Sequence, residues 1–222
     1  MIPVIAIDGP SASGKGTVAQ RAAQRLGFHY LDSGAIYRAA GLAARQAGVA
    51  LDDQDALVQL AHNLELRFDG ERVLLAGQDV SIAVRGEQAG KDASAIAALP
   101  RLRQALLDRQ RAFRVPPGLV ADGRDMGSVV FADAQLKIFL TASPEARAER
   151  RVKQLIEKGI PASIEKILED LRERDARDAA RSAAPLKMCD DAVLLDTTQR
   201  SIDEAVQFVV QRFHAVARQA VR

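Results

Sequence analysis

Residues 4–17 read Val-Ile-Ala-Ile-Asp-Gly-Pro-Ser-Ala-Ser-Gly-Lys-Gly-Thr, and this stretch decides the fold. A short apolar run ends at Asp8, and a loop flanked by glycines then leads to Lys15 at the start of a helical pattern. Gly9, Gly14 and Lys15 match the pattern G-x-x-x-x-G-K of a phosphate-binding loop, or P-loop. Glycines let successive N–H groups point at one oxyanion, and the helix N-terminus and the lysine add positive charge. The stretch therefore predicts that a nucleoside triphosphate binds here.

An alternative interpretation is a glycine-rich turn whose lysine is merely solvated. The strand before the loop and the helical spacing after it, at Val18, Ala19, Ala22, Ala23 and Leu26, favour phosphate binding. After Lys15 the usual Ser or Thr is replaced by Gly16, and a hydroxyl follows one place later at Thr17. We therefore expect magnesium to be held mainly by water and phosphate oxygens, as this ion readily is.

Composition restricts the possible functions. The chain has 222 residues, 48% of them hydrophobic, which is enough for one sizeable α/β domain with a small insertion. Its 31 basic and 29 acidic residues leave a net charge of +2, which argues against a role in coating nucleic acid. The single cysteine, Cys189, excludes an internal disulfide and a cysteine-based metal cluster. Because no basic leader and no long apolar segment is present, we expect a soluble cytoplasmic protein.

Five short apolar segments are typical of buried parallel strands, and helical patterns separate most of them. They span residues 4–7, 28–31, 119–121, 137–140 and 193–195. This alternation predicts a doubly wound α/β sheet. Four of the segments end at or beside Asp8, Asp32, Asp122 and Asp196. Ligands bind beyond the carboxyl ends of strands in such sheets, so we expect the functional site at this edge.

One segment breaks the alternation of strands and helices. Residues 64–80 alternate partly between apolar and polar types around an Asp69-Gly70 turn, which is a β-hairpin pattern. An antiparallel ribbon within a parallel plan suggests an inserted lobe over residues 60–92. A helix is then predicted to begin near Ser94 and to run through Phe113, until Pro116-Pro117 stops it.

A mixed-charge segment over residues 163–181 predicts a helix, most of whose charges are solvated. Its apolar stripe consists of Ile164, Ile167, Leu168 and Leu171. The continuation of that stripe carries Arg174, Asp178 and Arg181, and charged groups on an inward face need partners. A phosphate-bearing ligand could supply them, and so could an internal salt-bridge cluster.

Two strand-end loops are further candidates for ligand binding. The loop Asp122-Gly-Arg-Asp-Met-Gly127 is either an ordinary polar turn or a second ligand site opposite the P-loop. After the second strand, Asp32 or Ser33 could simply cap a helix. Arg38 would then lie about one turn further in, near a second helix N-terminus that can bind an anion.

A third basic group follows the fourth strand. Arg147, Arg150 and Arg151 lie on a helix that is predicted to begin near Ser143-Pro144. They fit contact with a donor nucleotide or a solvated basic helix about equally well.

Together these segments resemble the bacterial cytidylate kinase family. The matching strings are residues 7–17, 31–38 (Leu-Asp-Ser-Gly-Ala-Ile-Tyr-Arg), 100–103 (Pro-Arg-Leu-Arg), 121–127 (Ala-Asp-Gly-Arg-Asp-Met-Gly) and 172–178 (Arg-Glu-Arg-Asp-Ala-Arg-Asp). They are spread over residues 4–196, and the second and fourth are far more specific than the P-loop. Gly16 is shared with this family, so the resemblance has no serious departure.

The resemblance implies an α/β P-loop NTPase fold: a five-stranded parallel sheet flanked by helices, with a small antiparallel β insertion and a short lid. Residues 1–222 would form a single kinase domain, with 60–92 as the lobe that binds the nucleoside monophosphate and 150–165 as the lid region. It also implies transfer of the γ-phosphoryl of ATP to CMP or dCMP in pyrimidine nucleotide metabolism, with Mg²⁺ accompanying ATP. We expect a monomer with no nucleic-acid and no membrane partner.

The resemblance further implies a role for each matched residue. ATP would be held by Gly9, Pro10, Ser11, Ala12, Ser13, Gly14, Lys15, Gly16 and Thr17. The cations that act on the transferring group would be Lys15, Arg38, Arg124, Arg174 and Arg181, the last two from the lid. CMP would be bound by Asp32, Ser33, Arg38, Ser94, Arg103, Arg124, Asp125 and Asp178. No side chain is a firm metal ligand, and we assign Asp122 only to orienting water bound to magnesium.

The chemistry of the ligands supports these assignments. A carboxylate such as Asp125 suits the N4 amino group of cytosine, while Arg103 and Ser94 can donate to its N3 and O2 atoms. Uracil would place an acceptor against Asp125, at a cost of about 1–3 kcal/mol for each unsatisfied buried group. Phosphoryl transfer mainly needs in-line positioning and positive charge around the equatorial oxygens. The acceptor is already anionic, so no general base is needed.

Three other functions compete with this hypothesis. The first is a P-loop kinase for another monophosphate or for a non-nucleotide acceptor. The second is a GTPase-type switch, but its Asn-Lys-x-Asp motif is absent, because the only asparagine, Asn63, precedes Leu64. The third is a nucleic-acid-binding ATPase, which the near-neutral charge disfavours.

Overall fold

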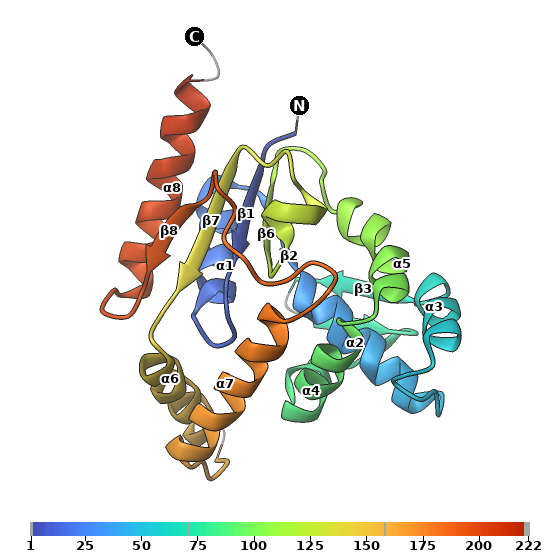
Figure 1. Ribbon diagram of the computed structural model, residues 1–222. Helices are drawn as coiled ribbons and strands as arrows, with labels where there is room; N and C mark the ends of the chain where they lie inside the picture. The colour runs from blue at the N-terminus through green and yellow to red at the C-terminus, as the bar shows by residue number, and fades with distance from the viewer. Residues whose placement is uncertain (1, 71, 158, 220–222) are drawn as a thin grey trace. The chain divides into compact units, whose positions relative to one another are not determined.

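The chain forms two compact units (Figure 1). The computed structural model describes residues 2–70, 72–157 and 159–219. Unit 1 combines Met1–Leu31 with Phe113–Arg222, and unit 2 is Asp32–Ala112. Unit 2 is wider than the lobe predicted over residues 60–92, because the helices on either side of that segment pack with it.

A five-stranded parallel sheet forms the centre of unit 1, with the strand order β2-β6-β1-β7-β8. The strands are β1 (Val4–Asp8), β2 (His29–Asp32), β6 (Leu119–Gly123), β7 (Leu136–Thr141) and β8 (Val193–Asp196). The five predicted parallel strands are therefore confirmed, with ends that agree to within two residues, but the edge strands β2 and β8 are only partly buried. The central strand β1 lies between β6 and β7, which come later in the chain. This arrangement makes the carboxyl end of β1 a topological switch point, where α/β sheets bind ligands.

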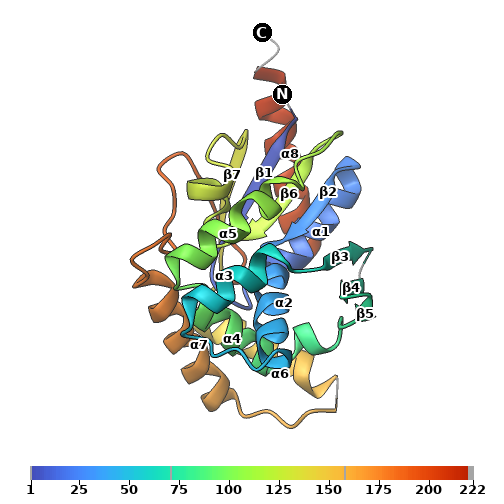
Figure 2. The ribbon, with the colours of Figure 1, turned by 90° about the vertical axis from the view of Figure 1, so that its right-hand side faces the viewer.

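Two helices of unit 1 share one hydrophobic core with the strands. Helix α1 (Lys15–Leu26) contributes small side chains such as Ala19 and Ala22, and α8 (Ile202–Gln219) contributes larger ones such as Val206 and Phe213. Figures 1 and 2 show α8 running alongside the strands. β1 is apolar on both faces because both are covered, and its first four residues are fully buried.

The remaining helices of unit 1 follow β6 and β7. A short π-helix, η2 (Met126–Val130), comes directly after β6. Helix α6 (Pro144–Ile156) begins directly after its N-cap Ser143, as predicted. Helix α7 (Ile164–Ala179) begins directly after its N-cap Ser163. The predicted lid region, 150–165, thus contains the second half of α6, the connection and the start of α7, and Lys158 lies outside the described residues.

Unit 2 contains helices and a small antiparallel sheet. The helices are α2 (Ser33–Gln46), α3 (Gln54–His62), the 3-10 turn η1 (Ala83–Arg85), α4 (Glu87–Ile96) and α5 (Pro100–Arg111). The sheet has the order β3-β4-β5, with β3 (Leu66–Asp69), β4 (Arg72–Leu75) and β5 (Gln78–Asp79). The predicted hairpin is confirmed, and β5 adds a third strand after a tight turn at Ala76 and Gly77, both of which have positive φ.

The long helix predicted from Ser94 through Phe113 is wrong, because the chain forms two helices there. Helix α4 starts seven residues before Ser94 and ends at Ile96, and α5 starts at Pro100. The proline ring disfavours helical geometry in the preceding residue, and Leu99 has the extended values φ −88° and ψ 110°. Pro100 therefore starts a second helix instead of lying inside one.

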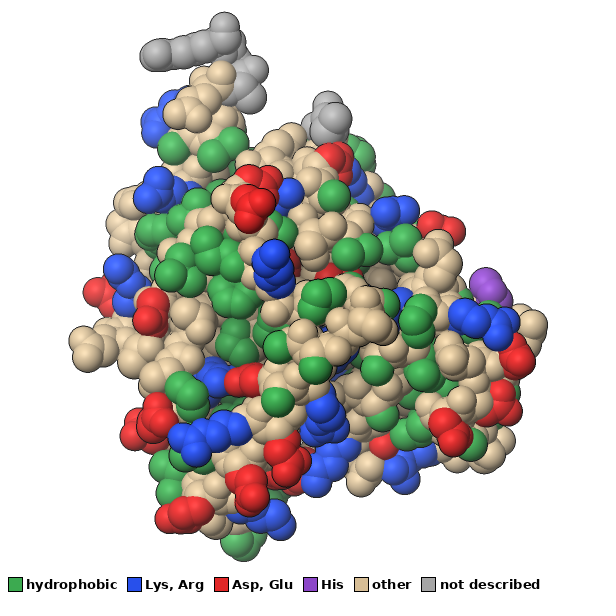
Figure 3. Space-filling model, viewed as in Figure 1, with side chains coloured by type: hydrophobic (Ala, Val, Ile, Leu, Met, Phe, Trp, Pro, Cys, Tyr) green, Lys and Arg blue, Asp and Glu red, His purple; other side chains and the backbone are tan. Residues whose placement is uncertain are grey.

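Charged side chains are frequent on the surface of two helices of unit 1, α6 and α7 (Figure 3). Over α6 and α7, acidic and basic groups are interspersed on the face shown in Figure 3. In the described ranges, no helix combines the length and the apolar character needed to cross a membrane.

Candidate nucleotide-binding site

The loop between β1 and α1 has the tight backbone that a P-loop requires. Gly14 is the N-cap of α1 with φ 91°, and Ala12 also has a positive φ, 57°. A Cβ atom on Gly9 would lie only 1.9 Å from the carbonyl oxygen of Leu140 in β7. Ser13 Oγ closes the loop by donating to the Pro10 carbonyl at 3.0 Å. The first turn of α1 has no acidic residue, so its N-terminus remains favourable for an anion.

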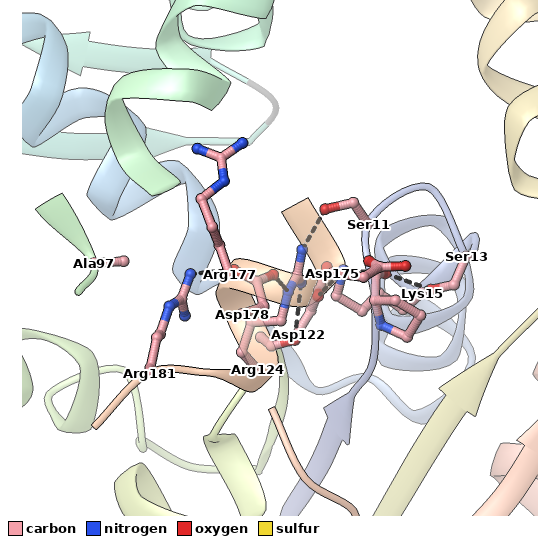
Figure 4. A network of polar contacts seen from close by, with 12 residues as sticks. Ser11, Ser13, Lys15, Ala97, Asp122, Arg124, Asp175, Arg177, Asp178 and Arg181 are labelled. Carbon is pink, nitrogen blue, oxygen red and sulfur yellow. Dashed lines mark hydrogen bonds and ion pairs between the residues drawn. The ribbon is translucent and has the colours of Figure 1, made fainter. Parts of the chain in front are cut away.

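Lys15 lies close to a carboxylate at the end of β6. Its Nζ atom is 3.7 Å from Oδ1 of Asp122 and donates to the Pro10 carbonyl at 3.3 Å (Figure 4). The hydroxyl of Tyr30, in β2, donates to Oδ2 of Asp122 at 3.3 Å. A Cβ atom on Gly16 would lie 3.1 Å from that same Oδ2 atom. The Asp122 carboxylate therefore occupies space that a side chain at position 16 would enter, which explains the glycine there.

A buried carboxylate of α7 pairs with Arg181, which was predicted on the inward face of this helix but lies just beyond its end at Ala179. Asp178 is 1% exposed; its Oδ2 accepts from Arg124 Nε at 2.8 Å, and its Oδ1 accepts from Arg181 (Figure 4). Burial would raise the pKa of Asp178, but the charges of Arg124, Arg181 and Arg174 outweigh it and hold this pKa below its usual range. Arg124 Nη2 also donates to Ser11 Oγ at 2.8 Å. The salt-bridge cluster is thus present, and ligand contact by the same residues stays a prediction.

Asp8 fixes the loop that follows β6. Its carboxylate accepts from the backbone N–H groups of Met126 and Gly127, both at 2.8 Å. Burial raises the pKa of Asp8 to about 6, although these two hydrogen bonds act in the opposite direction. Asp125, the residue before this anchor, is 4% exposed and is the N-cap of η2. The loop predicted as a second ligand site is therefore held from the end of β1.

Two arginines of α6 bind the P-loop backbone instead of solvent. Arg147 Nη1 donates to the Ser11 carbonyl at 3.1 Å, and Arg150 Nη1 donates to the Ser13 carbonyl at 2.9 Å. Thr197, just after β8, donates its hydroxyl to the same Ser13 carbonyl at 3.1 Å. The solvated-helix alternative is therefore wrong for Arg147 and Arg150, and contact with a donor nucleotide stays a prediction.

The predicted residues at the start of unit 2 lie around the N-terminus of α2. Asp32, not Ser33, is the N-cap, because its Oδ1 accepts from Ala35 N at 2.9 Å. Ser33 is the first helical residue and is buried. Arg38 Nη2 donates to Oδ2 of Asp32 at 2.7 Å, so the arginine lies one turn into the helix beside its cap.

The predicted base-reading residues of unit 2 lie on α4 and α5. Arg103 donates to the Ala97 carbonyl at 3.1 Å, and its guanidinium lies 5.6 Å from the ring centroid of Tyr37. Ala97 caps α4 three residues after Ser94. Ser94 Oγ is buried and has no hydrogen-bond partner among the described residues. A buried hydroxyl of this kind is available to a ligand that can accept or donate a hydrogen bond.

Each unit therefore contains one part of the predicted site. Unit 1 brings together the P-loop, Lys15, Asp122, Arg124, Arg174, Asp178 and Arg181, with Asp125 on the adjoining loop, and unit 2 contains Asp32, Ser33, Arg38, Ser94 and Arg103. Sequence reasoning missed the contacts of Tyr30, Arg147, Arg150 and Thr197. For the two arginines a signal existed, since the helix start at Ser143-Pro144 and their spacing of three place them on one helical face.

Comparison with known proteins identifies relatives over almost the whole chain. The family model "Cytidylate kinase" matches residues 5–215. A cytidylate kinase of Cupriavidus necator is 57% identical over 97% of this chain and 97% of its own length. One of Bordetella bronchiseptica is 57% identical over 96% of each chain, and one of Burkholderia ambifaria is 59% identical over 98% of this chain and 96% of its own.

Proposed function

The chain belongs to the cytidylate kinase family, and on that premise we propose that it transfers the γ-phosphoryl of ATP to CMP or dCMP, giving CDP or dCDP. The observation that carries the proposal is the 57% identity to a cytidylate kinase over 97% of both chains. The P-loop geometry and the arginine cluster of unit 1 supply the physical basis. A kinase of this type needs positioning and positive charge more than covalent chemistry.

On the donor side, the P-loop would hold the phosphates of ATP. The backbone N–H groups of residues 9–17 and the N-terminus of α1 provide donors and a positive potential. Lys15, 11% exposed at its side chain, would follow the γ-phosphoryl group as it moves. Water must be kept from this group during transfer. The segment 150–165 is our candidate for the lid that excludes it.

On the acceptor side, the phosphate of CMP would compete with Asp178 for arginines. Arg124 and Arg181 are already desolvated and oriented by that carboxylate, so little further ordering is needed when a phosphate arrives. Arg38 and Ser33 would hold the same phosphate from the N-terminus of α2. Once Arg124 and Arg181 bind the phosphate, the Asp178 carboxylate would be available to accept a hydrogen bond from the ribose.

The base would be recognised by Ser94, Arg103 and Asp125. The buried Ser94 hydroxyl lacks a hydrogen-bond partner among the described residues, as expected of a group whose partner is a bound ligand. Arg103, on α5, donates to the carbonyl of Ala97 at the end of α4, the helix that carries Ser94. Asp125, as a carboxylate, would accept from the N4 amino group of cytosine. The predicted 60–92 lobe would then act as part of the wider unit 2. The predicted monomeric state and cytoplasmic location stay predictions.

A rate and substrate comparison tests the proposal. We expect turnover with CMP and dCMP and little with UMP, AMP or a sugar acid. Arg38→Ala should lower turnover of CMP by about 10²-fold, because a cation on the acceptor phosphate is lost. Asp125→Ala should reduce the preference in kcat/KM for CMP over UMP by about tenfold or more. Arg101→Ala, which removes an exposed arginine of α5, is the matched control. Preference for any acceptor other than a cytidine monophosphate would refute the proposal.

Magnesium would enter with ATP, and Asp122 is the residue that fits it. Its carboxylate lies at the mouth of the P-loop, 8% exposed at its side chain, and carboxylate oxygens suit this hard cation or its bound water. Bound there, the ion would neutralise charge on the phosphate oxygens. In the described part of the chain, no cluster of three or more His, Cys, Asp or Glu residues forms a metal site.

Asp122→Asn is therefore expected to raise the Mg²⁺ concentration for half-maximal activity several-fold. The amide keeps the shape of the carboxylate and can still accept from Tyr30, but it has no charge to attract a hydrated cation. A titration of activity against Mg²⁺ at saturating ATP measures the effect. Asp191→Asn, which removes an exposed carboxylate paired with Lys137, is the control. An unchanged magnesium dependence in Asp122→Asn would remove the assignment.

A further inference from the structure

Arg147 is a buried arginine that joins three separate elements of unit 1. Only 3% of the residue is exposed. Its Nε donates to the Ala142 carbonyl beyond β7 at 3.1 Å, its Nη1 to the Ser11 carbonyl of the P-loop at 3.1 Å, and its Nη2 to Asp175 Oδ2 on α7 at 2.6 Å. A buried charge needs such partners, and the planar fork of arginine can serve all three at once.

The Ser11 residue is linked to α7 a second time. Its hydroxyl accepts from Arg124, which in turn donates to Asp178 (Figure 4). Asp175 and Asp178 are three residues apart and therefore lie on the same face of α7. Two arginines from different elements thus connect one P-loop residue to two adjacent carboxylates of one helix.

The link through Arg147 has a direct consequence for the anion-binding side of the P-loop. In a planar trans peptide the C=O and the N–H point in opposite directions. Holding the Ser11 carbonyl toward α6 therefore turns the Ala12 N–H to the opposite side, where an oxyanion would accept it. Ala12 has φ 57°, a value that costs a non-glycine residue energy and persists only where neighbours enforce it.

We propose that Arg147 is a positioning residue for the donor phosphates and that Asp175 holds it in place, so that the position of α7 sets the shape of the P-loop. This inference rests on the proposed function, because it assumes that the P-loop binds ATP. It assigns neither residue to contact with substrate. Tight binding of ATP then requires α7 to pack against α6. Because α7 also carries Arg174 and Asp178, the position of these two residues and the affinity for ATP depend on the same helix.

The chain offers a matched control within the same two helices. Arg172 on α7 and Glu145 on α6 form a second ion pair at 3.5 Å, with side chains 62% and 61% exposed. This pair joins α6 to α7 as the Arg147–Asp175 pair does, but both its side chains lie in solvent. Glu145→Gln and Asp175→Asn therefore remove the same kind of inter-helix pair, and only the second disturbs the arginine on Ser11.

Calorimetric titration of each variant with a non-hydrolysable ATP analogue, and separately with CMP, tests the inference. We expect Asp175→Asn to weaken binding of the ATP analogue about tenfold while CMP affinity changes less than twofold. Glu145→Gln should change both affinities less than twofold. Arg147→Lys keeps the charge but loses the planar guanidinium that donates to three acceptors, so it should also weaken binding of the ATP analogue about tenfold. This variant tests the inference if Asp175→Asn does not fold.

Each outcome has a distinct meaning. Equal effects of Asp175→Asn and Glu145→Gln on ATP affinity, or wild-type affinity in Asp175→Asn, would show that the buried pair is only structural and would overturn the inference. Equal losses of ATP and CMP affinity in Asp175→Asn would do the same. Failure of the wild-type protein to phosphorylate CMP, with ATP binding and the variant differences intact, would instead count against the proposed function alone.

Discussion

Replacing Lys15 with glutamine is expected to lower kcat with ATP and CMP by about 10³-fold, the size of loss seen when a group that stabilises transition-state charge is removed. Lys15 supplies an ammonium group at the N-terminus of α1, within 3.7 Å of the Asp122 carboxylate. With glutamine at this position, the negative charge of Asp122 would face the γ-phosphate without the neighbouring cation. The loss should therefore exceed that of an ordinary hydrogen bond.

The measurement is steady-state kcat and KM for both substrates, together with a thermal melt to show that the variant is folded. Lys153→Gln is the control, since Lys153 is an exposed lysine on α6. The KM for CMP should change little, because Lys15 is assigned to the donor. A Lys15→Gln enzyme with kcat within tenfold of the wild type would show that Lys15 does not act on the transferring group.

Most of the fold could be predicted because local patterns and global topology agree. The strands contain short apolar runs, and four of the five end at or beside an aspartate at one edge of the sheet. The helix over residues 94–113 was wrong because its apolar spacing continues across Pro100, and backbone geometry overrides spacing there. The third strand β5 was missed because it has only two residues, which is too short for a period to show.

Site residues could be predicted where a charged side chain stands at a sequence position that should be apolar. Arg174, Asp178 and Arg181 stood out because charges continued an apolar stripe. The structure confirms that Asp178 is buried and pairs with Arg181, and the charge of Arg174 helps to lower the pKa of Asp178. Arg147 and Tyr30 were not identified as support for the P-loop. Their contacts join residues more than 90 positions apart. The helical spacing places Arg147 and Arg150 on one face, but which backbone groups that face meets depends on the tertiary fold.

Substituting alanine for Gly9 should lower the free energy of unfolding by about 3 kcal/mol, a large value for one added methyl group. For a chain of this size the loss corresponds to a fall in Tm of about 6–12 °C. The added Cβ would lie 1.9 Å from the Leu140 carbonyl oxygen. Both groups are backbone or directly attached to it, so no side-chain rotation can relieve the overlap. Either β7 or the start of the P-loop must move, and ATP affinity should fall as well.

Gly27→Ala separates this overlap from the cost of backbone strain alone. Gly27 ends α1 with φ 66°, and a Cβ atom there would meet nothing within 4 Å. Its substitution should cost only about 1 kcal/mol, from the left-handed conformation. Thermal and denaturant unfolding of both variants gives the comparison. We expect Gly9→Ala to be clearly less stable than Gly27→Ala. If the two variants were equally stable and Gly9→Ala bound ATP like the wild type, the added methyl group would not overlap β7, and the close contact between Gly9 and Leu140 would be refuted.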